Sequence, residues 1–95
     1  MKRNFTNQKA KVLYHLANGG PLTRVTAMTT MNISNLPTRI HELRHQHDVD
    51  IHSTTKYHPV TGQRYVAYWM TQAEAAFQTH CGTMRLQDGE FVPTI

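Results

Sequence analysis

The segment SNLPTRIHELRHQ, residues 34–46, constrains the fold of this chain more than any other. Ser34 is a favourable N-cap residue, and Pro37 falls in the first turn, where a missing N–H costs no intrahelical hydrogen bond, so a helix is predicted to begin near Asn35. Its apolar residues have the i, i+4, i+7 spacing of a buried stripe: Leu36, Ile40 and Leu43. Another face is short, polar and able to form hydrogen bonds: Asn35, Thr38, Arg39 and Glu42. The segment therefore predicts an amphipathic helix that presents a polar face to a ligand.

Two shorter helices are predicted before this one. The first covers about residues 7–18 and ends at NGGP, whose glycines and proline stop a helix. The second covers about residues 23–30, with Thr23 as its N-cap. Its apolar residues are Leu22, Val25 and Met28. Only MNI separates it from the next helix, and two short helices with so tight a connection match the helix-turn-helix arrangement, in which the second helix enters the major groove of DNA.

A β-hairpin is predicted after the helices. VDIHSTTKY alternates between two faces, QRYVAYWM is rich in aromatic and β-branched residues, and HPVTG between them predicts a turn. The hairpin is expected to gain stability by packing apolar side chains onto the helices: Val49, Ile51 and some of Tyr65, Val66, Tyr68 and Trp69. TQAEAAF then opens a last helix with a capping box from Thr71 to Glu74.

These elements together predict an α+β fold, a winged helix-turn-helix made of three helices, a two-stranded β-hairpin wing and a C-terminal helix. The domain is expected to cover residues 1–80. Residues 81–95 have no strong pattern and are expected to form a tail that is either disordered or placed at a dimer interface.

Positive charge is concentrated in the front half of the chain. Residues 1–47 hold seven Lys and Arg residues against Glu42 alone, a net charge of +6, whereas the whole 95-residue chain carries +4. A basic region of this kind is expected in a protein that binds the phosphate backbone, because each neutralised phosphate releases counterions. The single cysteine excludes an intramolecular disulfide and no apolar run is long enough to span a membrane, so a cytoplasmic protein is predicted. No residue pattern indicates an enzyme, and no cofactor is predicted.

Three segments resemble a known family: QKAKVLYHLANGGPLT, LPTRIHELRHQ and TGQRYVAYWM. The most telling pattern is RIHELR followed by a G-x-[KR]-Y-x-x-Y hairpin, here Gly62, Arg64, Tyr65 and Tyr68. It resembles small winged helix-turn-helix proteins encoded by phages and prophages. In that family a glycine commonly ends the recognition helix just after the Leu-Arg pair, where this chain has HQHD. The resemblance implies a DNA-binding fold and leaves the regulatory or replicative task open.

The pattern and the resemblance together assign candidate contacts with double-stranded DNA. Residues expected to read bases are Asn35, Thr38, Arg39 and Glu42. Residues expected to contact the backbone or to act in the wing are Lys9, Lys11, Arg24, Ser34, Arg44, Lys56, His58, Gln63 and Arg64. Arg39 suits a bidentate contact to guanine O6 and N7, and Asn35 suits one to adenine. Glu42 either accepts a hydrogen bond from cytosine N4 or pairs with Arg39.

The histidines and the aromatic residues each admit two interpretations. His41, His45 and His47 have spacings that occur in metal sites, but no further ligand cluster completes one, so no metal is predicted. They are expected instead to line a phosphate-facing surface, where protonation would make DNA binding tighter at about pH 6 than at about pH 8. Trp69 and the tyrosines are expected in the core rather than as groups that stack on bases.

Three functions are compatible with the sequence. The leading hypothesis is a sequence-specific DNA-binding protein, a phage or prophage transcriptional regulator that docks helix 34–46 in the major groove, uses the 56–64 hairpin as a wing and acts as a homodimer. The first alternative is an architectural factor in phage recombination, replication or DNA packaging. The second is a winged-helix module that binds or inhibits a host or phage protein.

Overall fold

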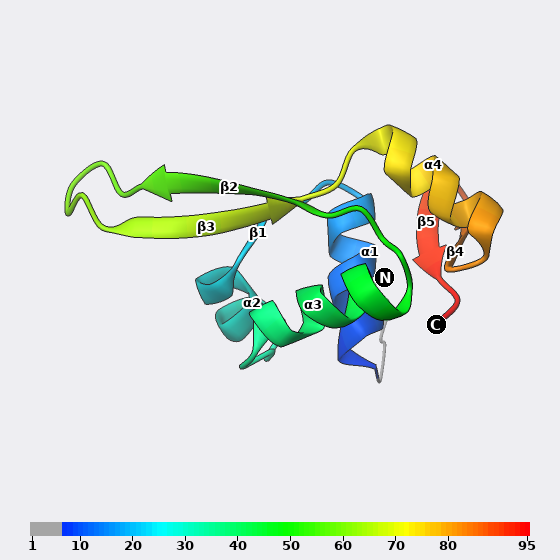
Figure 1. Ribbon diagram of the computed structural model, residues 1–95, viewed down its shortest axis with the longest axis horizontal. Coiled ribbons are helices and arrows are strands. Elements are labelled where there is room, and N and C mark those ends of the chain that lie inside the picture. The colour runs from blue at the N-terminus through cyan, green and yellow to red at the C-terminus, as the bar shows by residue number, and fades with distance from the viewer. Residues whose placement is uncertain (1–6) are drawn as a thin grey trace.

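The computed structural model describes residues 7–95, which form four helices and five strands (Figure 1). The helices are α1 (Gln8–Ala17), α2 (Arg24–Thr30), α3 (Leu36–Gln46) and α4 (Gln72–Cys81). The strands are β1 (Leu22–Thr23), β2 (His52–Tyr57), β3 (Arg64–Trp69), β4 (Met84–Gln87) and β5 (Glu90–Pro93). The predicted α+β architecture of three helices, a hairpin wing and a further helix is confirmed. The first six residues of the predicted domain, with the cations Lys2 and Arg3, lie outside the described residues.

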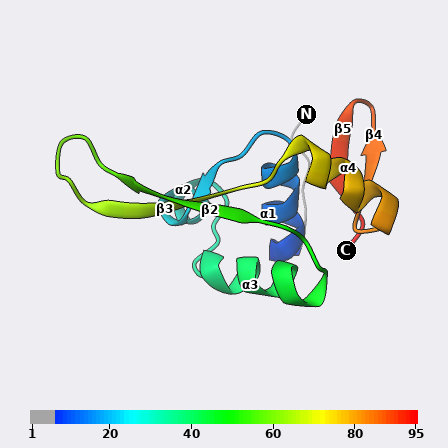
Figure 2. The same cartoon turned by 45° about the horizontal axis from the view of Figure 1, so that its top comes forward.

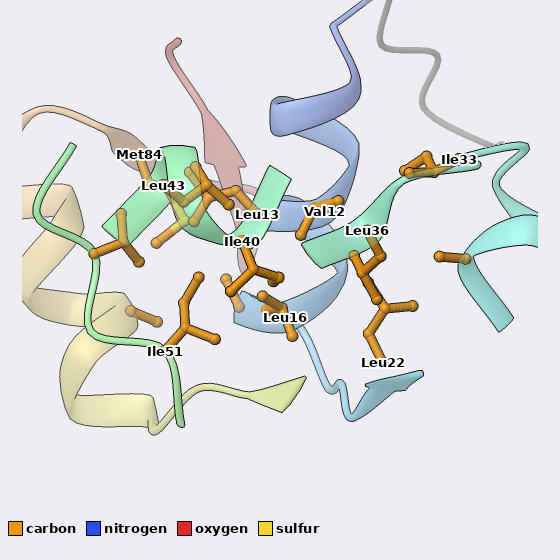
Figure 3. Packing of buried hydrophobic residues seen from close by; sticks show 14 residues of the cluster. Val12, Leu13, Leu16, Leu22, Ile33, Leu36, Ile40, Leu43, Ile51 and Met84 are labelled. Atoms are coloured by element: carbon orange, nitrogen blue, oxygen red, sulfur yellow. The ribbon is translucent and has the colours of Figure 1, made fainter. Parts of the chain in front are cut away.

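The core lies between α1 and α3. The predicted stripe of α3 is confirmed, because Leu36, Ile40 and Leu43 are each at most 1% exposed. They pack with side chains from five other segments of the chain (Figure 3): Val12, Leu13, Leu16, Leu22, Ile33, Ile51 and Met84. Burying a side chain of this size contributes about 1.5–3 kcal/mol. The stripe therefore fixes which face of α3 turns away from the core.

Most helix starts follow the predicted capping chemistry. The side chain of Thr23 accepts a hydrogen bond from the Thr26 N–H at 3.2 Å, and that of Thr71 accepts one from the Glu74 N–H at 3.0 Å. The N-cap predicted for α3 is wrong by one residue. The carbonyl of Asn35 accepts the first intrahelical bond, from the Arg39 N–H at 3.3 Å, which makes Asn35 rather than Ser34 the N-cap.

Helix α3 ends without a glycine, as the segment HQHD at this place indicates. Asp48 takes that place with φ +53°, the left-handed conformation that Asp tolerates better than most residues. The chain then turns inward, and the Val49 N–H donates to the Leu43 carbonyl at 3.0 Å. The turn buries Val49 and Ile51 before β2 begins.

The wing is built on a three-stranded antiparallel sheet with the order β1-β3-β2. β2 and β3 pair over six residues each, from His52 opposite Trp69 to Tyr57 opposite Arg64. β1 pairs with the base of β3 alone, at Tyr68 and Ala67. The outer part of the hairpin is therefore a two-stranded arm that projects beyond α2 (Figure 1).

The packing expected for the aromatic residues of β3 is only partly right. Tyr68 packs against the core cluster, whereas Tyr65, Val66 and Trp69 are 36–40% exposed. At the base of the hairpin, Trp69 packs on β2: its ring stacks on that of His52 with centroids 4.5 Å apart, and its Nε1 donates to the Thr54 hydroxyl at 2.9 Å. The arm extends past the helices, so its side chains have only one another to pack against.

The apolar residues predicted to pack from α2 also differ. Leu22 is fully buried, but it belongs to β1, while Val25 and Met28 are 68% and 48% exposed. The inner face of α2 is formed by Ala27, which lies on the opposite side of this seven-residue helix. Two apolar side chains of α2, Val25 and Met28, are therefore exposed on the surface.

Residues 81–95 were predicted to form a tail that is either disordered or placed at a dimer interface. Most of this segment is instead ordered: it forms a second hairpin, β4–β5, that packs on α1 and α4. Met84 and Val92 are buried in it. Its two-residue turn is Asp88-Gly89, both with positive φ, which is a recognised hairpin signal that the sequence carries. None of the helices among residues 7–95 is long and apolar enough to cross a membrane.

Candidate nucleic-acid interface

Two of the residues predicted to read bases, Arg39 and Glu42, form a half-buried ion pair on α3. Arg39 Nη1 lies 2.9 Å from Glu42 Oε1, one helical turn away, and the two side chains are 28% and 23% exposed. Of the two roles predicted for Glu42, the pair with Arg39 is formed. The Nε of Arg39 is buried and has no hydrogen-bond partner among the described residues. Leaving such a donor unpaired costs about 1–3 kcal/mol, so a partner that accepted a hydrogen bond from Nε would offset that cost.

The N-terminal end of α3 is open. Asn35 is exposed, and its side chain forms no capping hydrogen bond with the helix. Thr38 is half-buried on the next turn. The amide of Asn35 is therefore not committed to holding the helix start, and it can form hydrogen bonds with another molecule.

Arg44 forms contacts within the protein that the sequence did not predict. Its Nε and Nη2 both donate to the Ile51 carbonyl, at 3.1 and 2.5 Å, and its guanidinium lies 5.9 Å from the centroid of the Tyr68 ring. These contacts join α3 to the base of the wing. No local sequence signal marks this link between the two elements, and the phosphate contact of Arg44 remains a prediction.

The other predicted backbone cations fall into two groups. Lys9 belongs to α1, and its side chain reaches the C-terminal end of α3, where its Nζ is 3.3 Å from Gln46 Oε1 and 3.4 Å from His47 Nε2. Lys11 is half-buried on α1, whereas Arg24 is exposed as the first residue of α2. Ser34 is exposed in the connection between α2 and α3. Ser34 therefore lies beside the N-terminal end of α3, whereas Lys9 contacts the C-terminal end.

The histidines of α3 share one side of the helix, as the i, i+4 spacing predicts. The rings of His41 and His45 are 4.3 Å apart, and both residues are exposed. Within residues 7–95, no group of three His, Cys, Asp or Glu side chains is placed to hold a metal ion. The two rings form a polar extension of the outer face toward its C-terminal end.

The wing tip brings together the four residues predicted there, Lys56, His58, Gln63 and Arg64, all of them exposed. His58 has an additional role that the sequence did not reveal. Its backbone N–H donates to the Gln63 carbonyl at 2.9 Å, and its Nδ1 accepts from the N–H groups of Val60 and Thr61 at 3.2 and 3.3 Å. The ring of His58 thus closes the turn from inside.

The N-terminal end of α3 and the tip of the wing lie toward the same end of the molecule (Figures 1 and 2). α3 runs beneath the base of the wing with its N-terminal end toward α2, and the wing tip lies at that end of the molecule in both views (Figures 1 and 2). The molecule is 41 Å long and 26 Å by 24 Å across. The open end of α3 and the tip of the arm are thus presented on one end of the protein, as a helix and wing that grip one duplex require.

The comparisons with known proteins agree with this geometry. A family model described as a winged helix-turn-helix domain matches residues 7–73, more than two thirds of the 95-residue chain. The comparison with curated proteins found no match, and neither did the comparison with solved structures. The matched region runs from the N-cap of α1 to the first turn of α4 and contains α3 and the wing. The chain therefore belongs to the winged helix-turn-helix family of DNA-binding domains.

Proposed function

We propose that this protein is a sequence-specific binder of double-stranded DNA that acts as a transcriptional regulator of the phage or prophage type. Helix α3 docks in the major groove with its N-terminal end against the base edges, and the wing contacts the backbone or the minor groove. The observation that carries the proposal is the outer face of α3, where Asn35 and Arg39 offer amide and guanidinium donors that the fold leaves incompletely used.

Arg39 is the principal base-reading residue in this proposal. A guanidinium makes a bidentate contact to O6 and N7 of guanine, and no other base presents that pair of acceptors in the major groove. The ion pair with Glu42 holds Arg39 down on the helix in the free protein. On DNA, Arg39 exchanges part of that pair for guanine, and Glu42 then restricts where the guanidinium can point. Asn35 contacts adenine at a second position, and Thr38 contacts another base of the site.

The backbone contacts in this proposal come from polar and basic side chains of α1, α2, the α2–α3 connection and the arm. Arg24 and Ser34 lie at the start of α2 and in the α2–α3 connection, and Lys56 and Arg64 lie on the arm. Lys11 on α1 and Gln63 at the tip complete the set. The segment 51–73 contains no Asp or Glu, so the arm approaches phosphates without a repelling charge.

A second copy is part of the proposal because one small module buries limited DNA surface, and a symmetric pair on a palindrome doubles it. The alternative architectural role is favoured by one observation, the exposed apolar tip of the wing. In that role the same module binds DNA with little sequence preference and changes its shape.

The experiment that tests the function is selection of binding sites from a random pool of duplex DNA, at about 0.15 M salt so that nonspecific binding is weakened. An enriched motif supports sequence-specific regulation, and the spacing of any repeated half-site gives the arrangement of the copies. Binding without enrichment supports the architectural role instead. Absence of duplex binding contradicts both and leaves the protein-interaction module as the function.

A further inference from the structure

The tip of the wing carries an exposed apolar side chain that contributes no packing to the folded protein. Val60 is 86% exposed, and Pro59 beside it is also exposed. Both lie in the turn between β2 and β3, at the far end of the arm (Figure 1). No packing in the folded chain accounts for an apolar pair at this position.

The tip is an ordered turn. Besides the two bonds to its ring, His58 closes the loop through its backbone, donating to the Gln63 carbonyl at 2.9 Å and accepting from the Gly62 N–H at 2.8 Å. The Thr61 hydroxyl also accepts from the Gln63 N–H at 3.2 Å. These bonds hold Pro59 and Val60 at the apex before any partner arrives, which lowers the entropy that binding would otherwise cost.

The charge around the tip selects the partner. Lys56 and Arg64 are exposed on the two strands that lead to the turn, and residues 51–73 contain no acidic side chain. A surface for an apolar protein groove has no need of an arm that is basic and free of acids along its whole length. A polyanion whose interior is apolar and stacked, as in duplex DNA, matches both the basic stem and the apolar apex.

We propose that Pro59 and Val60 act as a wedge that enters the minor groove, partly unstacks one base step and bends the duplex. Apolar residues at the ends of basic arms kink DNA in this way, and pyrimidine–purine steps such as TA and CA unstack most easily, so the wing favours such a step beneath it. The inference rests on the proposed binding of duplex DNA and adds to it a change in DNA shape.

The test compares the wild-type protein with Val60→Thr, which keeps the shape of the side chain and replaces one methyl group with a hydroxyl. The DNA is a duplex of about 30 base pairs, with the selected site or an arbitrary sequence, bearing a fluorophore at each end for energy transfer. A 2-aminopurine placed in turn at each step reports unstacking. Binding affinity is measured on the same samples.

The wild-type protein is expected to bring the duplex ends closer and to raise 2-aminopurine fluorescence at one step near the wing. Val60→Thr is expected to bind within about tenfold of wild type, because the other contacts with DNA remain. It is expected to lose most of both signals, because the wedge is no longer apolar. Leu86→Ser is the matched control: Leu86 is 62% exposed on β4, away from the wing, and its replacement should leave both signals unchanged.

A second pair of variants tests the ordered turn. His58→Asn keeps a side-chain acceptor that can close a turn of this kind, and it should retain the bend. His58→Ala removes the acceptor of both ring-mediated bonds. It should reduce the bend although the Val60 side chain itself is unchanged.

The outcomes separate the two proposals. Absence of duplex binding by the wild-type protein contradicts the proposed function and, with it, the wedge. Binding without a bend, or a bend that Val60→Thr preserves in full, overturns the wedge alone and leaves the proposed function intact.

Discussion

Arg39 and Glu42 form an ion pair on α3, with 2.9 Å between Nη1 and Oε1, on the surface that we propose contacts DNA. An acidic residue at this place opposes the phosphates, and it also holds the guanidinium that is proposed to read a base. In the proposed complex, Glu42 would therefore lower the affinity for all duplexes and raise the selectivity for the base that Arg39 reads.

Glu42→Gln is expected to tighten binding to all duplexes by about two- to fivefold, because it removes one repelling charge and loosens the hold on Arg39. Discrimination at the base that Arg39 reads should fall at the same time. Titrations of a selected and an unrelated duplex measure both effects. Asp88→Asn makes the same charge change in the turn of the β4–β5 hairpin and should alter neither. Weaker binding by Glu42→Gln would mean that the carboxylate itself accepts from a base.

Arg44→Ala is expected to lower the free energy of unfolding by about 1–3 kcal/mol, because it leaves the Ile51 carbonyl without its partner and removes the contact with Tyr68. Urea unfolding followed by circular dichroism measures the change. Arg44→Lys keeps the charge but loses the fork, so it should not restore stability. If Arg44→Lys restored full stability, the contact with the Ile51 carbonyl would not be the reason that Arg44 matters.

Arg24→Ala is the counterpart of Arg44→Ala: Arg24 is an exposed cation, and its removal should weaken DNA binding and leave the free energy of unfolding within about 0.5 kcal/mol of wild type.

Asp48→Gly is expected to stabilise the protein by roughly 1 kcal/mol. Asp48 has φ +53°, a conformation that costs less for glycine, and its negative charge lies at the unfavourable end of α3. The midpoint of urea unfolding reports the gain. Asp48→Asn removes the charge and keeps a side chain, so the difference between the two variants separates the backbone contribution from the electrostatic one. A loss of stability in both would show that the carboxylate has a partner worth more than this strain.

Asn18 holds the C-terminal hairpin against α1. Its Nδ2 donates to the Phe91 carbonyl at 2.7 Å, and its Oδ1 accepts from the Phe91 N–H at 2.9 Å. Asn18→Ala should therefore destabilise the hairpin, raising amide exchange of β4 and β5 by about tenfold, in line with one to two lost hydrogen bonds. Gln87→Ala, an exposed change within the hairpin itself, should not. Unchanged exchange in Asn18→Ala would show that the apolar contacts of Met84 and Val92 hold the hairpin alone.

The helices and the wing could be predicted from the sequence because their signals are local. The stripe of α3, the caps at Thr23 and Thr71 and the alternating strands each depend on residues a few positions apart. The i, i+3 partnership of Arg39 and Glu42 was foreseeable for the same reason.

The remaining features depend on contacts distant in sequence or on weak signals. β1 has two residues and exists because it pairs with β3, more than forty positions away. Arg44 reaches the Ile51 carbonyl only because Asp48 turns the chain back, so its spacing alone suggests a phosphate contact. The C-terminal hairpin did carry a local signal in Asp88-Gly89, but its strands are four residues long and only half apolar. The base-reading roles of Asn35, Thr38 and Arg39 remain predictions, since they depend on a partner outside the chain.

The central claim is that Arg39 reads one base, and the most direct test measures the affinities of wild type and Arg39→Ala for the selected duplex and for each of its single-base variants. The account predicts that wild type prefers guanine at one position and that Arg39→Ala loses about 1–3 kcal/mol, together with the discrimination at that position alone. A uniform loss across all duplexes would make Arg39 a phosphate contact, and no loss would contradict the docking of α3 in the major groove.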